Sequence, residues 1–262
     1  MHKTALVTGA SSGIGLATAR ALHAAGYTVY GTSRNPDAGN PEYEGIRYLP
    51  LELTDPGSIE RLAAMLPPLD VLVNNAGSSQ MGAIEETPSE KILELYETLL
   101  FGNIRLIQRV LPGMRARGRG WIVNVSSLAE LMPVPCSAVY ASAKAALHML
   151  GTGLRQELRP FGIRVVTVAP SFIKTSIVQE RLHCDNSPYS DMIQSAGRIR
   201  DAEIASGSPP EAVAEKIVKI VGMKNPSSFY PAGKKATLLA IASKWLPERL
   251  REWAVRKRFR LR

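Results

Sequence analysis

The sequence predicts an α/β fold, with a doubly wound parallel sheet of about seven strands flanked by helices in a single domain. Short apolar runs alternate with longer amphipathic stretches from the first residues onward, which is the pattern of βαβ units around a parallel sheet. The length of 262 residues suits one large α/β domain and does not require a second.

The individual elements follow from this alternation. The expected strands are the short apolar runs at 4–8, 27–32, 46–51, 69–74, 120–126 and 163–169, with a last short one near 228–231. The expected helices occupy 13–25, 56–66, 88–117, 138–160 and 209–223. Asp55 before Pro56, and Ser208 before Pro209, have the form of an N-cap followed by proline at the first helical position.

The segment 172–207 does not fit this alternation. It is too long and too irregular for a simple connection between two elements. Long loops of this kind in compact domains are usually lids or binding loops, so we interpret 172–207 as a lid or substrate loop.

The composition is that of an ordinary globular protein. With 45% hydrophobic and 21% charged residues, the chain has enough apolar side chains for a full core, which excludes a disordered protein. Its two cysteines form no disulfide framework, and no signal-peptide pattern precedes Leu6, so we expect a cytoplasmic protein. Cysteines, histidines and carboxylates form no ligand cluster, so we expect no metal site.

A glycine-rich turn follows the first expected strand. Gly9, Gly13 and Gly15 stand between strand 4–8 and helix 13–25. Glycines there let the backbone approach a pyrophosphate, and the free N–H groups and the helix dipole bind its charge. The turn therefore predicts a Rossmann-like dinucleotide site; a plain glycine-rich βα turn is the alternative.

The end of the second expected strand indicates which dinucleotide binds. NAD sites generally place an Asp or Glu there to bind the adenosine ribose. This chain has Ser33 and Arg34 instead, and a guanidinium can bind a 2′-phosphate through two hydrogen bonds. We therefore expect NADP; in the alternative interpretation, Arg34 is a solvated surface residue.

Tyr140 and Lys144 have the spacing of neighbours on one helical face. A lysine ammonium beside the phenol would lower the tyrosine pKa from its ordinary value of about 10. Tyr140 then becomes a candidate acid or base, although a Tyr and a Lys at this spacing also occur by chance.

Taken with Asn74-Asn75-Ala76-Gly77 after the fourth strand, these motifs resemble the short-chain dehydrogenase/reductase family. The resemblance runs from Thr4 to about Thr175 in the expected order. The run Tyr30-Gly31-Thr32-Ser33-Arg34-Asn35 looks most like the branch with 17β-hydroxysteroid, retinol and acyl-dihydroxyacetone-phosphate reductases.

The resemblance implies four catalytic residues. Tyr140 would give a proton to a carbonyl, or take one from an alcohol, and Ser127, rather than Ser126, would polarise the same oxygen. Lys144 would bind the nicotinamide ribose and lower the Tyr140 pKa. Asn103 would hold a water linking the lysine to solvent, unless it is a helix-packing amide.

The resemblance also implies the contacts with the cofactor. They are Gly9, Ser11, Ser12, Gly13, Ile14, Gly15, Ser33, Arg34, Glu52, Leu53, Asn75, Ala76, Gly77, Tyr140, Lys144, Pro170, Ile173 and Thr175. A purely structural role is the alternative for Asn75 and Gly77. The chain departs from the family at Ser171, where a glycine is usual, and at Glu52, where an aspartate is common; a glycine-only conformation would strain Ser171.

Together these features predict an NADP(H)-dependent oxidoreductase that reduces a ketone or aldehyde to an alcohol, or runs the reverse reaction. Apolar residues beside Ser127 and Tyr140 and in the lid predict a steroid-, retinoid- or lipid-like substrate. A catalytically silent NADP-binding sensor or scaffold is the alternative, against which intact Ser127, Tyr140 and Lys144 argue. The family implies a homodimer or homotetramer through helices 88–117 and 138–160.

The C-terminal segment is strongly basic. Residues 244–262 carry eight Lys or Arg and two Glu, and subtracting their +6 from the net charge of +9 leaves +3 for the other 243 residues. We therefore expect no specific nucleic-acid surface, but a catalytic domain at 1–243 followed by a basic amphipathic helix or tail at 244–262. That tail either contacts an anionic membrane surface or caps the pocket or a subunit interface.

Overall fold

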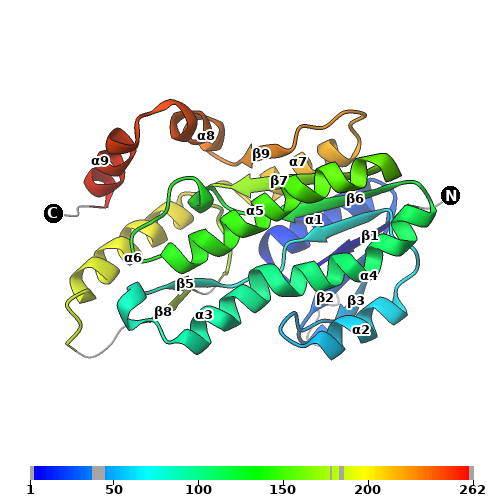
Figure 1. Cartoon of the computed structure of the whole chain (residues 1–262), viewed down its shortest axis with the longest axis horizontal. Coiled ribbons are helices and arrows are strands. Elements are labelled where there is room, and N and C mark those ends of the chain that lie inside the picture. The colour runs from blue at the N-terminus through cyan, green and yellow to red at the C-terminus, as the bar shows by residue number, and fades with distance from the viewer. Residues whose placement is uncertain (1–2, 37–44, 178, 183–185, 260–262) are drawn as a thin grey trace.

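The computed structural model describes residues 3–36, 45–177, 179–182 and 186–259, which form a central sheet with helices on both faces (Figure 1). Its seven strands are all parallel and lie in the order β3-β2-β1-β4-β6-β7-β9. They are β1 (Lys3–Val7), β2 (Tyr27–Ser33), β3 (Ile46–Pro50), β4 (Val71–Asn74), β6 (Gly120–Val125), β7 (Ile163–Pro170) and β9 (Phe229–Ala232). The predicted fold is confirmed, and each predicted strand is found within two residues of its expected ends.

Successive residues of each strand face opposite layers of the core. On β1, Ala5 and Val7 pack in one cluster, while Leu6 packs in the other. The first layer lies under α1 (Gly13–Ala24) and α7 (Glu211–Val221), and the second under α2 (Pro56–Met65), α4 (Gly102–Ala116) and α5 (Ala138–Leu158). Because helices cover both faces, the sheet is doubly wound (Figure 1).

The strand order reverses between β1 and β4, and hydrogen bonds tie the loops at this point together. The Thr8 hydroxyl oxygen accepts from the backbone N–H groups of Asn75 and Ala76, both at 2.9 Å. The Asn75 side chain donates to the Thr8 carbonyl at 2.9 Å and to the Gly9 carbonyl at 3.3 Å. Open α/β sheets bind their ligands outside the carboxyl ends of the strands at such a reversal.

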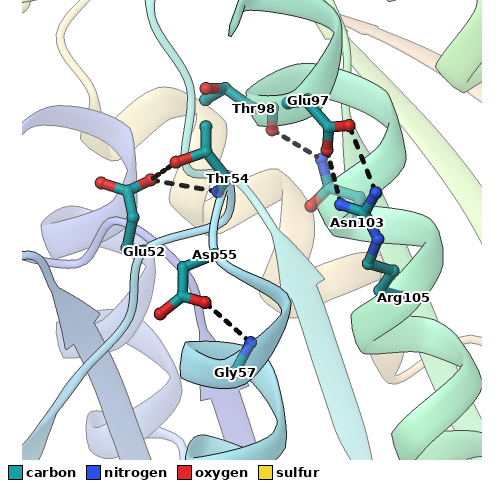
Figure 2. Close-up of polar contacts among 8 residues, drawn as sticks. All are labelled: Glu52, Thr54, Asp55, Gly57, Glu97, Thr98, Asn103 and Arg105. Carbon is teal, nitrogen blue, oxygen red and sulfur yellow. Dashed lines mark hydrogen bonds and ion pairs between the residues drawn. The ribbon is translucent and has the colours of Figure 1, made fainter.

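The expected helix 88–117 contains a π-helical turn. It consists of α3 (Ser89–Tyr96), η3 (Glu97–Phe101, the π turn) and α4. Arg105 bridges this turn, because its guanidinium donates to both Glu97 carboxylate oxygens, at 2.5 and 3.2 Å (Figure 2). Single π turns inside α-helices occur often at functional sites.

The two predicted helix starts have different outcomes. The Asp55 carboxylate accepts from the Gly57 N–H at 2.8 Å, so Asp55 caps α2 as predicted (Figure 2). The Ser208 prediction was wrong: its hydroxyl accepts from the Lys234 N–H at 2.7 Å, and α7 begins after Pro210.

The segment 172–207 is more regular than predicted. Its helix α6 (Ser190–Ala205) is well formed, and β8 (Gln179–Arg181) pairs in parallel with β5 (Ser79–Met81) as a separate two-stranded sheet. The sequence conceals α6 because its N-cap residue makes no side-chain hydrogen bond, and β5 and β8 are too short to show a period. Residues 178 and 183–185 of this segment lie outside the described part of the chain.

The C-terminal segment forms two helices, the second of which lies beside α6 (Figure 1). They are α8 (Ala236–Trp245) and α9 (Glu248–Arg258), so the predicted boundary at 243/244 falls inside α8. On α9, Arg258 forms an ion pair with Glu203 of α6, and the following Phe259 is buried. Within the residues that the structure describes, no helix is long and apolar enough to cross a membrane.

Candidate active site

A cavity of about 1200 Å³ extends over the carboxyl ends of the strands, from the glycine turn to α9. Nearly all of the site residues predicted from the sequence line it, and only Gly15 and Asn103 do not. The structure thus brings together residues from both halves of the chain.

Close packing explains two of the glycines in the turn. Gly9 has a φ of +65°, and a Cβ there would lie 2.8 Å from the Ala76 Cα. A Cβ at Gly15 would lie 2.1 Å from the Gly9 carbonyl oxygen, so Gly15 supports the turn from behind instead of lining the cavity.

The N-terminus of α1 opens into the cavity and can hold an anion. Ser12, the N-cap residue, makes no side-chain capping bond, and the first turn carries no acidic side chain. The backbone N–H groups and the positive end of the helix dipole therefore remain available. Together with the close glycine turn, this arrangement fits the diphosphate of a dinucleotide.

The far end of the cavity can hold the adenosine. Arg34 is exposed there and, among the described residues, forms no ion pair. One oxygen of the Glu52 carboxylate accepts from the Thr54 N–H at 3.1 Å and from the Thr54 hydroxyl at 3.0 Å (Figure 2). Asn35 and Thr54 also line this end, and the sequence interpretation missed both.

Ser127, Tyr140 and Lys144 meet at the other end of the cavity. Ser127 follows β6 closely, and its hydroxyl lies near enough to the phenol of Tyr140 on α5 to act on the pKa of that phenol. Lys144 lies one helical turn further on, only 5% exposed, and its Nζ donates to the Val125 carbonyl at 2.9 Å. The strand end and the helix thus present a hydroxyl, a phenol and an amine to one wall.

The predicted lowering of the Tyr140 pKa was wrong for this structure. Burial raises the pKa of Tyr140 above its ordinary value, although the nearby Ser127 hydroxyl and the Arg200 charge oppose that change. Burial also lowers the pKa of Lys144 to about 8. Lys144 is not among the groups that shift the pKa of Tyr140, and desolvation decides the direction of the shift.

Asn103 lies behind the cavity wall, at the start of α4. It is 1% exposed, and its side-chain N–H₂ donates to the Leu99 carbonyl at 2.9 Å. The same group donates to the Thr98 carbonyl at 3.4 Å (Figure 2). Its Oδ1 is buried and has no partner among the described residues. The amide therefore both packs the π turn and offers an acceptor to a bound water.

The remaining predicted residues form the loop after β7. Pro170, Ile173 and Thr175 line the cavity, and Thr175 Cγ2 lies 3.2 Å from where a Gly13 Cβ would stand. Ser171, which replaces the usual glycine, does not have a positive φ. Its hydroxyl donates to the Lys234 carbonyl at 3.1 Å, so the chain accepts serine without backbone strain.

A buried carboxylate behind the lysine was not foreseen. The Glu130 side chain is 1% exposed, hydrogen-bonds with the Ser126 hydroxyl and lies 2.7 Å from Nδ1 of His148. Its negative charge acts to raise the pKa of Lys144, against the larger effect of burial. The burial of Glu130 depends on tertiary packing, so no local pattern could have revealed it.

Comparison with known proteins gives the same result as these observations. The sequence model described as short chain dehydrogenase matches residues 3–185. The chain is 34% identical over 260 residues to the 3-ketodihydrosphingosine reductase of Bacteroides thetaiotaomicron, covering 96% of each chain. It is 29% identical over 266 residues to the NADPH-dependent 3-dehydrocapnine reductase of Ornithobacterium rhinotracheale, covering 94% of this chain and 93% of the relative.

A solved structure extends the likeness to three dimensions. A short-chain dehydrogenase from Streptomyces avermitilis superposes with a TM-score of 0.82 at 32% identity, covering 97% of this chain and 98% of the other. Sequence, site geometry and fold agree, and the chain belongs to the short-chain dehydrogenase/reductase family of oxidoreductases.

Proposed function

We propose that this protein is an NADP(H)-dependent reductase of a ketone or aldehyde on an apolar or amphipathic, lipid-like molecule, or the dehydrogenase of the matching alcohol. The observation that carries the proposal is the meeting of Ser127, Tyr140 and Lys144 on the wall of one cavity that continues to the N-terminus of α1. Two relatives named as reductases of 3-ketodihydrosphingosine and 3-dehydrocapnine support a ketone substrate.

In this proposal, the protein places and protonates the carbonyl. A bound NADPH supplies the hydride. Tyr140 donates its phenolic proton to the carbonyl oxygen as negative charge develops there, and Ser127 donates a second hydrogen bond to the same oxygen. The raised pKa of Tyr140 suits proton donation, because the phenol stays protonated at neutral pH.

Lys144 and Asn103 support Tyr140 from behind. With a pKa of about 8, Lys144 is mostly protonated at neutral pH and can bind ribose hydroxyls while its charge stabilises the phenolate left after proton transfer. The unpaired Asn103 Oδ1 can hold a water on the path that returns a proton to the site.

The experiment that tests this function follows the loss of NADPH absorbance with a panel of aliphatic and lipid-like ketones. We expect turnover by the wild type, and a fall in kcat of about 10²–10⁴-fold in Tyr140→Phe, because the phenol supplies general-acid catalysis. Tyr140→Phe should still bind NADPH in a fluorescence titration. NADPH binding without reduction of any ketone by the wild type would favour the sensor or scaffold instead.

We also propose a dual role for the C-terminal helices, which follow the catalytic domain. The inner side of α9 caps the cavity, since Ala254, Val255, Arg258 and Phe259 line it. The two helices and the connection between them also expose large apolar residues, which together we call the outer face: Leu238, Ile241, Trp245, Leu246, Leu250 and Trp253. With the basic residues of the tail between them, these side chains suit the interface of an anionic membrane, where a cytoplasmic enzyme would meet lipid-like substrates.

A further inference from the structure

Arg200 of α6 extends into the cavity and belongs to none of the motifs discussed above. Its side chain is partly buried and lines the cavity together with Tyr140. One guanidinium nitrogen, Nη2, donates to the Ser79 hydroxyl at 3.0 Å. Ser79, at the start of β5, is only 3% exposed, so this contact fixes the guanidinium against the cavity wall.

The charge of Arg200 has no counter-ion in the described part of the chain. The carboxylates nearest to it in sequence bind elsewhere: Asp201 pairs with Arg181, and Glu203 pairs with Arg258. Within the same residues, Ser79 takes one of its five N–H donors and no partner takes the other four. These four donors are not sealed from solvent and stay accessible in the cavity that Arg200 lines, so they are available to an anionic ligand.

Arg200 stands at the reacting end of the cavity. Its partner Ser79 comes two residues after Gly77, where a Cβ would lie 3.9 Å from the Lys144 Nζ, and the Arg200 charge also acts to lower the pKa of Tyr140. Arg34, in contrast, follows β2, which lies three strand positions from β6 in the sheet, or about 14 Å at the usual strand spacing. Arg200 is therefore separate from the expected 2′-phosphate site.

We infer that Arg200 is a specificity-determining residue that binds an anionic group of the substrate near the reacting carbonyl. This inference rests on the proposed function. A planar guanidinium held by Ser79 matches a carboxylate, sulfonate or phosphate through two hydrogen bonds. Apolar residues of the same cavity, including Leu128, Val134, Ile204 and Val255, can bind the hydrocarbon part, so the substrate class is an amphipathic keto acid.

The test compares 3-oxododecanoate with its methyl ester, which keeps the ketone and the chain but lacks the negative charge. The quantity measured is the ratio of kcat/KM for the acid to that for the ester. We expect Arg200→Met to lower this ratio about 10–100-fold, the worth of one charge-assisted contact. Arg200→Lys, which keeps the charge but loses the paired geometry, should fall between the wild type and Arg200→Met.

The control is Arg198→Met, because Arg198 is exposed on the same helix and should leave the ratio unchanged. An unchanged ratio in Arg200→Met would overturn the inference. So would a weaker affinity of Arg200→Met for NADPH, because that result would assign the guanidinium to the cofactor. The kcat/KM ratio and the NADPH affinity are both measured on the full chain. The ratio cancels any loss of catalysis that is common to the acid and the ester.

A binding experiment separates this inference from the proposed function. Isothermal titration measures dodecanoate and dodecan-1-ol against the wild type and Arg200→Met, and no turnover is required. We expect the wild type to prefer dodecanoate and the variant to lose that preference. If this holds while no ketone is reduced, the anion site stands and the proposed reaction falls; no preference in the wild type would reject the site.

Discussion

At the scale of single residues, the protonation of Tyr140 and Lys144 depends on burial as much as on their spacing in the sequence. The four-residue interval places Tyr140 and Lys144 on one helical face, and that much is readable from the sequence. The directions of their pKa shifts cannot be read from the sequence, because desolvation depends on what packs around the two side chains. The same limit hid Glu130 and Arg200, whose partners His148 and Ser79 lie 18 and 121 residues away in the chain.

Lys144 should make stability depend on pH. The pKa of Lys144 is about 8 in the folded protein and 10.5 in the unfolded chain, so the unfolded chain holds this proton more tightly. Lys144 therefore lowers the free energy of unfolding by its full amount below pH 8, and this loss disappears as the pH rises towards 10.5. Its share of the free energy of unfolding should therefore rise by about 2 kcal/mol between pH 8 and 10. Because its pKa is raised, Tyr140 in the folded protein loses its proton above this range of pH 8 to 10.

Urea unfolding of the wild type and Lys144→Met at pH 8, 9 and 10 measures this effect. The difference between the two proteins removes the contributions of groups they share, such as Cys136. We expect the wild type to gain stability relative to the variant as the pH rises. Parallel pH curves would show that Lys144 is not held at a lowered pKa.

Arg34 should determine the choice of cofactor. Replacing it by Asp removes the guanidinium and places a carboxylate where a 2′-phosphate would bind, so kcat/KM for NADPH should fall about tenfold or more. The value for NADH should change much less, because NADH has no phosphate there. Steady-state kinetics with both cofactors checks this, with Arg34→Lys as the charge-preserving control; equal losses with NADPH and NADH would reject the assignment.

At the scale of elements, long periodic segments were predictable and short or uncapped ones were not. The seven strands of the main sheet and the long helices carry their own apolar periods. In contrast, β5 and β8 have three residues each and are defined only by pairing with each other. The π turn before Asn103 is also a tertiary feature, where Arg105 and Glu97 bridge the widened turn.

The α8–α9 unit should bind anionic membranes through its outer face. We expect the full chain to sediment with vesicles containing phosphatidylserine, and a chain ending at residue 244 to stay in solution. The double variant Trp245→Ser and Trp253→Ser keeps the inner face and should lose most of the vesicle binding, because these rings are 78% and 58% exposed.

That double variant also separates the two roles proposed for the tail. It should retain the activity of the wild type on a soluble ketone, whereas the truncated chain should lose activity because the cavity has lost its cap. Vesicle binding by the truncated chain would contradict the membrane role.

At the scale of the whole molecule, the sheet order and the two core layers follow from the alternation of short and long apolar patterns. The arrangement of subunits does not follow from these patterns. We propose that α4 and α5 form the dimer interface typical of the family. The large apolar side chains of Phe101 and Met149 on this side of the molecule are 38% and 68% exposed.

Met149→Glu should therefore shift the protein towards the monomer, because it places a charge in the proposed apolar contact. Analytical ultracentrifugation measures the change. Met192→Glu on α6 is the matched control, since Met192 is 38% exposed and α6 is not one of the helices of the proposed interface. A dimer that persists in Met149→Glu would place the interface elsewhere.

The central claim is that proton donation by Tyr140 is coupled to hydride transfer from NADPH onto a carbonyl carbon. The most direct measurement uses NADPH deuterated at the nicotinamide C4 transfer position and mass spectrometry of the alcohol product. We predict one deuterium on the carbinol carbon with the wild type, and labelled product formed about 10²–10⁴-fold more slowly with Tyr140→Phe, which should still bind the cofactor. An alcohol formed without the label, or labelled product formed equally fast by Tyr140→Phe, would contradict the account.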